Sequence, residues 1–166
     1  MFIKSHFDDY NFKKPFGVFK IVIALFVLVF ITMFLIKSTE LNLSDTNHRI
    51  DTLVLINNVE LETMISKNSN ERSIGLSQHL SLANNEAMLF VFDVSSVYSF
   101  WMKDMDFPID IFWLNENKEV VFIKENAQPS DYPQSYKPTS KALYVLETVK
   151  GFADTHEIEI GNQFSW

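Results

Sequence analysis

The sequence predicts a mainly β (α+β) protein, with a compact, barrel-like β-rich domain and one or two short helices behind a single transmembrane helix. Two observations predict this class. An uncharged apolar run lies at residues 21–36, and beyond residue 49 short apolar runs alternate with turn-forming residues. A chain of 166 residues suits one globular domain plus an appendage. We therefore divide it into a cytoplasmic N-terminal segment (1–20), a transmembrane helix (21–36), a polar tether (37–49) and a folded domain (50–166).

The apolar run at residues 21–36 contains no charged residue. As a helix it would reach about 24 Å, and residues 16–19 would supply the rest of a bilayer core of about 30 Å, with Lys20 reaching the headgroups. The run has no polar face, which a helix of a water-soluble core would keep. A cleaved signal peptide is the alternative, but residues 37–41 (KSTEL) offer no small-x-small cleavage site. Membrane lipid is therefore a predicted partner, through residues 21–36.

The distribution of charge predicts the orientation. Four lysines precede the run, whereas only Lys37 and Arg49 follow it closely. By the positive-inside rule the N-terminus is cytoplasmic and the folded domain lies outside the cytoplasm, in a periplasmic or extracellular position. Residues 37–166 carry ten Lys or Arg against nineteen Asp or Glu, which argues against a nucleic-acid partner. The absence of cysteine excludes disulfides and thiolate metal sites.

Within the domain, residues 50–56 and 59–65 flank Asn57-Asn58, which predicts a hairpin with a two-residue turn. Residues 115–118 (NENK), between the runs 109–114 and 119–124, suit the loop of a second hairpin. Ser69 or Asn70 is expected to cap a short helix that ends near Gly75 or His79. Residues 153–157 are expected to form a single helical turn. Further short strands are predicted at residues 87–92, 99–102, 109–114, 119–124, 142–149 and at an edge strand, 158–160, with those at 109–114, 119–124 and 142–149 in the centre of the sheet.

Six blocks in this order resemble the DUF192 (UPF0127) family. They are Arg72–Leu76 (RSIGL), residues 88–92 (MLFVF), 99–103 (SFWMK) and 108–111 (PIDI), Ala127 with Pro129, and residues 144–147 (YVLE) with Gly151. The resemblance covers about residues 50–161. It implies a compact β-rich domain with small helices, often exported or membrane-anchored, and brings no established substrate. The chain differs from the family pattern at Ser77, at Ala87 and at Asp104-Met105.

Two acids lie on strand faces that are otherwise apolar, Asp110 in residues 109–114 and Glu147 in residues 142–149. Because a buried charge is costly unless it is paired, each needs a partner or a function. One interpretation makes the two carboxylates an acid and a base of a site. In the other interpretation, each carboxylate forms a structural ion pair with Arg72 or Lys103. We predict that Arg72 contacts Glu147, Asp110 or both.

These residues define a candidate ligand-binding cleft made of Arg72, Trp101, Lys103, Asp104, Asp110 and Glu147. Trp101 could stack on a sugar or another ring, or simply belong to the core. The acids at Asp104, Asp106 and Asp110 lack the glycine and the distal glutamate of a calcium loop, so no metal site is predicted. No cofactor and no catalytic residue are predicted either.

The leading functional hypothesis is a binding or accessory module on the outer face of a membrane, since signals for catalysis are weak. One alternative is a hydrolase of envelope saccharide that uses Asp110 and Glu147 as paired carboxylates. Another is a subunit of a larger membrane assembly. The expected partner, beyond lipid, is thus an envelope ligand or a membrane protein.

Overall fold

The computed structural model describes residues 21, 23, 25–33 and 49–166. The chain divides into two compact units, residues 1–47 and 48–166, which are described separately. In the first unit the described residues are helical, and their large apolar side chains, such as Phe26 and Phe30, are exposed. No helix among the described residues is long and apolar enough to cross a membrane. The predicted span also includes residues 22, 24 and 34–36, which lie outside the described residues, as do residues 1–20 and 37–48.

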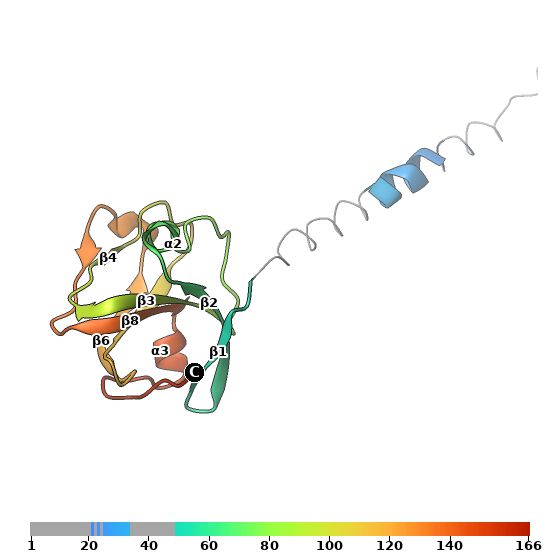
Figure 1. Cartoon of the computed structure of the whole chain (residues 1–166). Helices are drawn as coiled ribbons and strands as arrows, with labels where there is room; N and C mark the ends of the chain where they lie inside the picture. The colour runs from blue at the N-terminus through green and yellow to red at the C-terminus, as the bar shows by residue number, and fades with distance from the viewer. Residues whose placement is uncertain (1–20, 22, 24, 34–48) are drawn as a thin grey trace, which may run out of the picture. The chain divides into compact units, whose positions relative to one another are not determined.

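The second unit is a mainly β domain built on one mixed sheet of six strands in the order β1-β2-β3-β8-β5-β6 (Figure 1). Strands β2 and β3 are parallel, and all other neighbours are antiparallel. The bounds are β1 Thr52–Ile56, β2 Val59–Ser66, β3 Glu86–Ser96, β5 Ile109–Leu114, β6 Val120–Ala127 and β8 Ala142–Val149. A second, two-stranded sheet pairs β4 (Phe100–Trp101) with β7 (Ser135–Tyr136), and the helices are α2 (Ser69–Ile74), α3 (Phe152–Thr155) and the 3-10 turn Pro129–Asp131.

The predicted barrel-like closure is wrong, because the six-stranded sheet is open. Its edge strands β1 and β6 do not pair with each other. Instead the C-terminal segment forms an antiparallel bridge near each edge of the sheet. One joins Leu55 of β1 to Ser165, and the other joins Glu119, just before β6, to Gln163. The tail thus satisfies edge groups that a barrel would satisfy by strand pairing.

The two predicted hairpins are confirmed. Asn57 and Asn58 both have positive φ angles, 47° and 65°, as a two-residue turn between right-twisted strands requires. Strands β5 and β6 form the second hairpin. However, β6 lies at an edge of the sheet, although we predicted a central position for it. Strand β3 occupies a central position instead. Residues 158–160 form no strand, since the chain leaves α3 with the amide of Ile158 bonded to the carbonyl of Ala153 at 2.9 Å.

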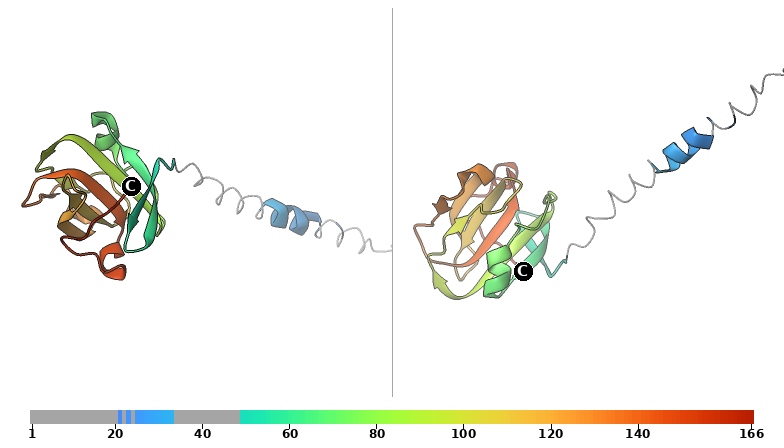
Figure 2. Two further views of the ribbon diagram at one scale, coloured as in Figure 1. Left: turned by 60° about the horizontal axis from the view of Figure 1, so that its bottom comes forward. Right: turned by 90° about the horizontal axis from the view of Figure 1, so that it is seen from above.

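Strand β5 is buried at all six positions, so the sheet carries a core on each face. On one face Phe112, Leu114 and Leu146 pack with Phe152 of α3. On the other face Ile111, Trp113 and Val145 pack with Leu76, which follows α2. Figures 1 and 2 show the two helices on opposite sides of β3 and β8. Because side chains alternate along a strand, successive residues of β5 and β8 face the two cores in turn.

Candidate ligand-binding site

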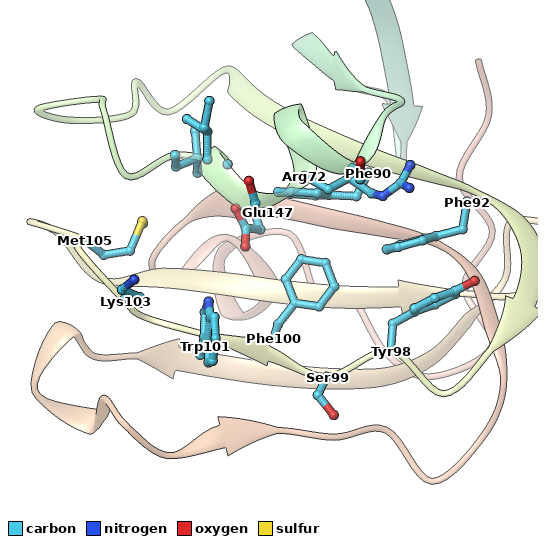
Figure 3. Close-up of a pocket in the computed structure, with 15 residues that line it drawn as sticks. Arg72, Phe90, Phe92, Tyr98, Ser99, Phe100, Trp101, Lys103, Met105 and Glu147 are labelled. Carbon is cyan, nitrogen blue, oxygen red and sulfur yellow. The ribbon is translucent and has the colours of Figure 1, made fainter.

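A pocket of about 330 Å³ opens on the α2 side of the sheet (Figure 3). Helix α2 and the turn after it form one wall, and residues of the segment 98–105 form another. Phe90 and Phe92 of β3 and Glu147 of β8 complete the lining. The volume lies at the lower end of the range of about 300–1,000 Å³ that is usual for small-molecule sites.

Helix α2 is held in place by its two ends. Asn68 caps it, not Ser69 or Asn70 as predicted: the side chain of Asn68 accepts a hydrogen bond from the amide of Glu71 at 2.9 Å. The Glu71 carboxylate accepts one in return from the amide of Lys67 at 2.8 Å, which holds the pKa of Glu71 below its ordinary value. The helix ends at Gly75, where φ is 52° and an added Cβ would lie 3.3 Å from the ring of Phe90. Glycine therefore lets the turn approach a wall of the pocket.

Arg72 lines the pocket, but its guanidinium is engaged elsewhere. Its Nη1 donates to the backbone carbonyls of Val91, at 3.0 Å, and Lys67, and the group lies 4.9 Å from the centroid of the Phe92 ring. No ion pair or hydrogen bond within residues 49–166 joins Arg72 to Glu147 or Asp110. The predicted contact is therefore wrong. Two backbone carbonyls and an aromatic face satisfy the guanidinium instead of a carboxylate.

Glu147 is the buried acid of the pocket. Its side chain is 5 % exposed and points into the cavity (Figure 3). In the described part of the chain it has no hydrogen-bond or ion-pair partner, and burial alone raises its pKa from the ordinary value of 4.5 to about 8. The cause is desolvation, which penalises the charged form. At neutral pH the carboxyl is thus mostly protonated, with a polar group left unsatisfied by the protein.

Asp110 does not belong to the pocket. Its side chain is completely buried, and its two oxygens accept hydrogen bonds from the amides of Asn126 at 2.8 Å and Ala153 at 3.0 Å. In the register of β5 and β8, Ile111 lies opposite Glu147 and Asp110 lies opposite Thr148. Since neighbours on a strand point to opposite faces, the two acids project from opposite sides of the sheet. This geometry argues against the paired carboxylates of the hydrolase hypothesis, and gives Asp110 the structural role of joining β6 and α3.

Trp101 and Lys103 do line the pocket, so four of the six predicted cleft residues come together there, with Arg72 and Glu147. Trp101 is 56 % exposed, at the rim. Asp104 does not line the pocket. It lies 3.8 Å from the Nζ of Lys103 in an exposed ion pair, which contributes little to stability.

The sequence reasoning missed the aromatic lining. Phe90 meets Phe100 edge-to-face with ring centroids 4.9 Å apart, and Phe92 stacks on Tyr98 at 3.5 Å. A signal for two of them was present, because Phe90 and Phe92 are two residues apart on a strand and share one face. Phe100 lies in the two-residue strand β4 and Tyr98 shortly before it, and so short a strand shows no period that could assign a direction. No group of three His, Asp or Glu residues suited to a metal occurs among the residues that the structure describes.

The fold and the pocket together define a small, mixed-sheet β domain with an aromatic cavity around one unpaired acid. Residues 52–166 match the family model of DUF192, described as "Uncharacterized ACR", and the chain belongs to this family, as its sequence blocks predicted. The family has no established function.

Two solved structures share the fold. A protein of unknown function from Novosphingobium aromaticivorans DSM 12444 is 24% identical, with a TM-score of 0.66 over 72% of this chain and 90% of that one. A "putative transcription regulator" from Sinorhizobium meliloti 1021 is 24% identical, with a TM-score of 0.62 over 64% of this chain and 81% of the other. The comparison with curated proteins gave no match.

Proposed function

We propose that this protein is a membrane-anchored, extracytoplasmic binding module that holds a small ligand in the pocket beneath α2. The observation that carries the proposal is the carboxyl of Glu147, which is 5 % exposed, points into the cavity and has no partner in the described part of the chain. Buried polar groups are normally hydrogen-bonded, so a carboxyl that faces a cavity without a partner from the described residues is suited to bind a ligand. A polar group of a ligand would satisfy it.

Binding is favoured over catalysis by the surroundings of this acid. The paired-carboxylate mechanism of a saccharide hydrolase needs a second acid beside the scissile bond. The other buried acid, Asp110, is committed to two backbone amides on the opposite face of the sheet. Of the remaining charged groups of the lining, Arg72 is bonded to two backbone carbonyls and Lys103 lies beside Asp104.

A screen of small molecules tests the binding proposal. The full chain, labelled with ¹³C at the methionine methyl groups and kept in the uncharged detergent dodecyl maltoside, would be titrated with soluble alcohols, amides, amines and carboxylates. Met105 lines the pocket and Met33 lies on the N-terminal helix, so the first reports binding and the second reports non-specific partitioning. We expect at least one compound to shift the Met105 signal saturably and to leave the Met33 signal unchanged. If no compound in the library does so, the binding proposal is wrong.

The anchor and the orientation are supported by the sequence, in which an uncharged run at residues 21–36 follows four lysines and precedes an acidic domain. Protease added to intact spheroplasts should digest the domain, residues 50–166, and protection from the protease would contradict this topology. The alternative role, as a subunit of a larger membrane assembly, would be supported by a stoichiometric partner that co-purifies in detergent.

A further inference from the structure

We propose that the ligand of this pocket carries an organic cation, such as a substituted ammonium group, which pairs with the carboxylate of Glu147 against the aromatic wall. The inference rests on the proposed binding function and specifies the class of ligand. It depends on three features of the pocket: an acid with no counterion, two cations that are held away from it, and a set of aromatic rings.

No residue in the described part of the chain supplies a counterion to Glu147. Arg72 and Lys103 are the two basic residues of the lining. The Arg72 guanidinium is bonded to the carbonyls of Lys67 and Val91 and lies over Phe92. The Lys103 side chain is 49% exposed and its nearest acid is Asp104, at 3.8 Å. The charged form of this carboxyl is therefore destabilised by desolvation, and neither basic residue of the lining is paired with it to offset that cost.

Five aromatic residues line the cavity, and Phe92 is already occupied by the Arg72 guanidinium and by stacking on Tyr98. Phe100 and Trp101 lie in the part of the lining that faces Glu147 (Figure 3). A cation over an aromatic face gains about 0.5–2 kcal/mol, more where water is excluded. Carboxylate and rings together thus suit an alkylammonium group better than either would alone.

Neutral and anionic ligands suit the pocket less well than a cation. A neutral hydroxyl or amide would satisfy the hydrogen bonds of protonated Glu147 but would gain no Coulombic attraction in this poorly solvated site. An anion would lie against Glu147, and to pair with Arg72 it would compete with the carbonyls of Lys67 and Val91. A cation gains both the ion pair and the rings, and its binding is coupled to loss of the Glu147 proton.

This coupling makes the proposal testable by pH. The other titratable groups of the lining are Arg72 from α2 and Tyr98 and Lys103 from the segment 98–105. Glu147 titrates between pH 6 and 8.5, since burial raises its pKa to about 8. The affinity for a cation of fixed charge should therefore rise on the order of 10- to 100-fold from pH 6 to pH 8.5.

The experiment uses the full chain in dodecyl maltoside, which has no ammonium headgroup to compete, and follows the Met105 methyl signal. The probes are benzyltrimethylammonium, whose charge does not vary with pH, benzyl alcohol and benzoate. We expect the cation to bind most tightly, with the stated rise in affinity, and the Met33 signal to stay unchanged. Glu147→Gln should remove the pH dependence and weaken binding of the cation to the level of the alcohol. Glu125→Gln, which removes an exposed acid of β6, should keep both.

Other outcomes would overturn the inference in distinguishable ways. Binding of benzyl alcohol or benzoate at Met105 as tight as that of the cation would refute the cationic ligand while leaving the proposed binding function in place. Binding of benzyltrimethylammonium that is independent of pH in the unmodified chain, a result that needs no variant, would refute the role of Glu147. If none of the three probes shifts the Met105 signal, this inference is refuted. If no compound of the wider library shifts it either, the binding function itself is refuted.

Discussion

Raising the pH is expected to destabilise the folded domain through Glu147. Burial raises its pKa from the ordinary value of 4.5 to about 8, so between these values the folded state keeps a proton that the unfolded chain has lost. The contribution of Glu147 to stability is complete below pH 4.5 and is lost as the pH rises towards 8. The free energy of unfolding should fall by about 1.4 kcal/mol per pH unit in this window. About three and a half pH units separate the two values, which makes the full loss roughly 5 kcal/mol, a large part of the 5–15 kcal/mol that is usual for a domain.

The assay is urea unfolding of the full chain in dodecyl maltoside at pH 5, 6, 7 and 8, followed by tryptophan fluorescence, for which the fully buried Trp113 is a reporter. The difference in unfolding free energy between Glu147→Gln and the unmodified chain should grow by roughly 4 kcal/mol from pH 5 to pH 8 in favour of the variant. The comparison between variants removes the contributions of the other titrating groups to the pH dependence, because those groups are the same in both chains. Glu125→Gln should follow the unmodified chain. If the unfolding free energies of the unmodified chain and of Glu147→Gln vary with pH in parallel, Glu147 is not desolvated in the folded state, and the reasoning is refuted.

Three further substitutions test the structural roles assigned above, all by the same urea unfolding. Asp110→Ala should lower the free energy of unfolding by about 2–5 kcal/mol, because two backbone amides lose their acceptor, one of them buried; a loss below about 1 kcal/mol would contradict that role. Arg72→Ala should cost only about 1–3 kcal/mol, since it frees two carbonyls rather than an acid; a loss of about 5 kcal/mol would indicate a stranded charge. Gly75→Ala should cost about 1–3 kcal/mol, from a positive φ and a close approach to Phe90; unchanged stability would mean that the turn can relax.

Local patterns predicted much of the fold. Asn57-Asn58 between two apolar runs indicated the first hairpin, because asparagine tolerates the left-handed backbone of its turn. The apolar character of both faces of residues 109–114 indicated a strand covered on both sides, and β5 is such a strand. Neither pattern carries information about which strands far apart in the chain pair. The parallel β2–β3 pair and the edge position of β6 were therefore missed.

The candidate site shows the same division. Alternation placed Glu147 and Asp110 on apolar faces, a property of each strand alone, and it correctly identified both as acids that need an explanation. Whether they meet depends on the register between β5 and β8, which sets Ile111 rather than Asp110 opposite Glu147. One residue of register moves a side chain to the other face, so no pattern within either strand could decide the question.

The sequence by itself determined the family, the β-rich character of the domain, its two hairpins and the residues that carry charge into apolar strands. These follow from local composition, turn chemistry and period. Only the tertiary structure decided that Asp110 is satisfied by the amides of Asn126 and Ala153, and that Arg72 is held by backbone carbonyls. Among the described residues, Glu147 then has no partner, and it lies in a pocket lined by aromatic side chains. The physical reason is that desolvation and hydrogen bonding depend on what surrounds a side chain in space. Those surroundings come from segments far apart in the chain, such as α2 and β8 around the pocket.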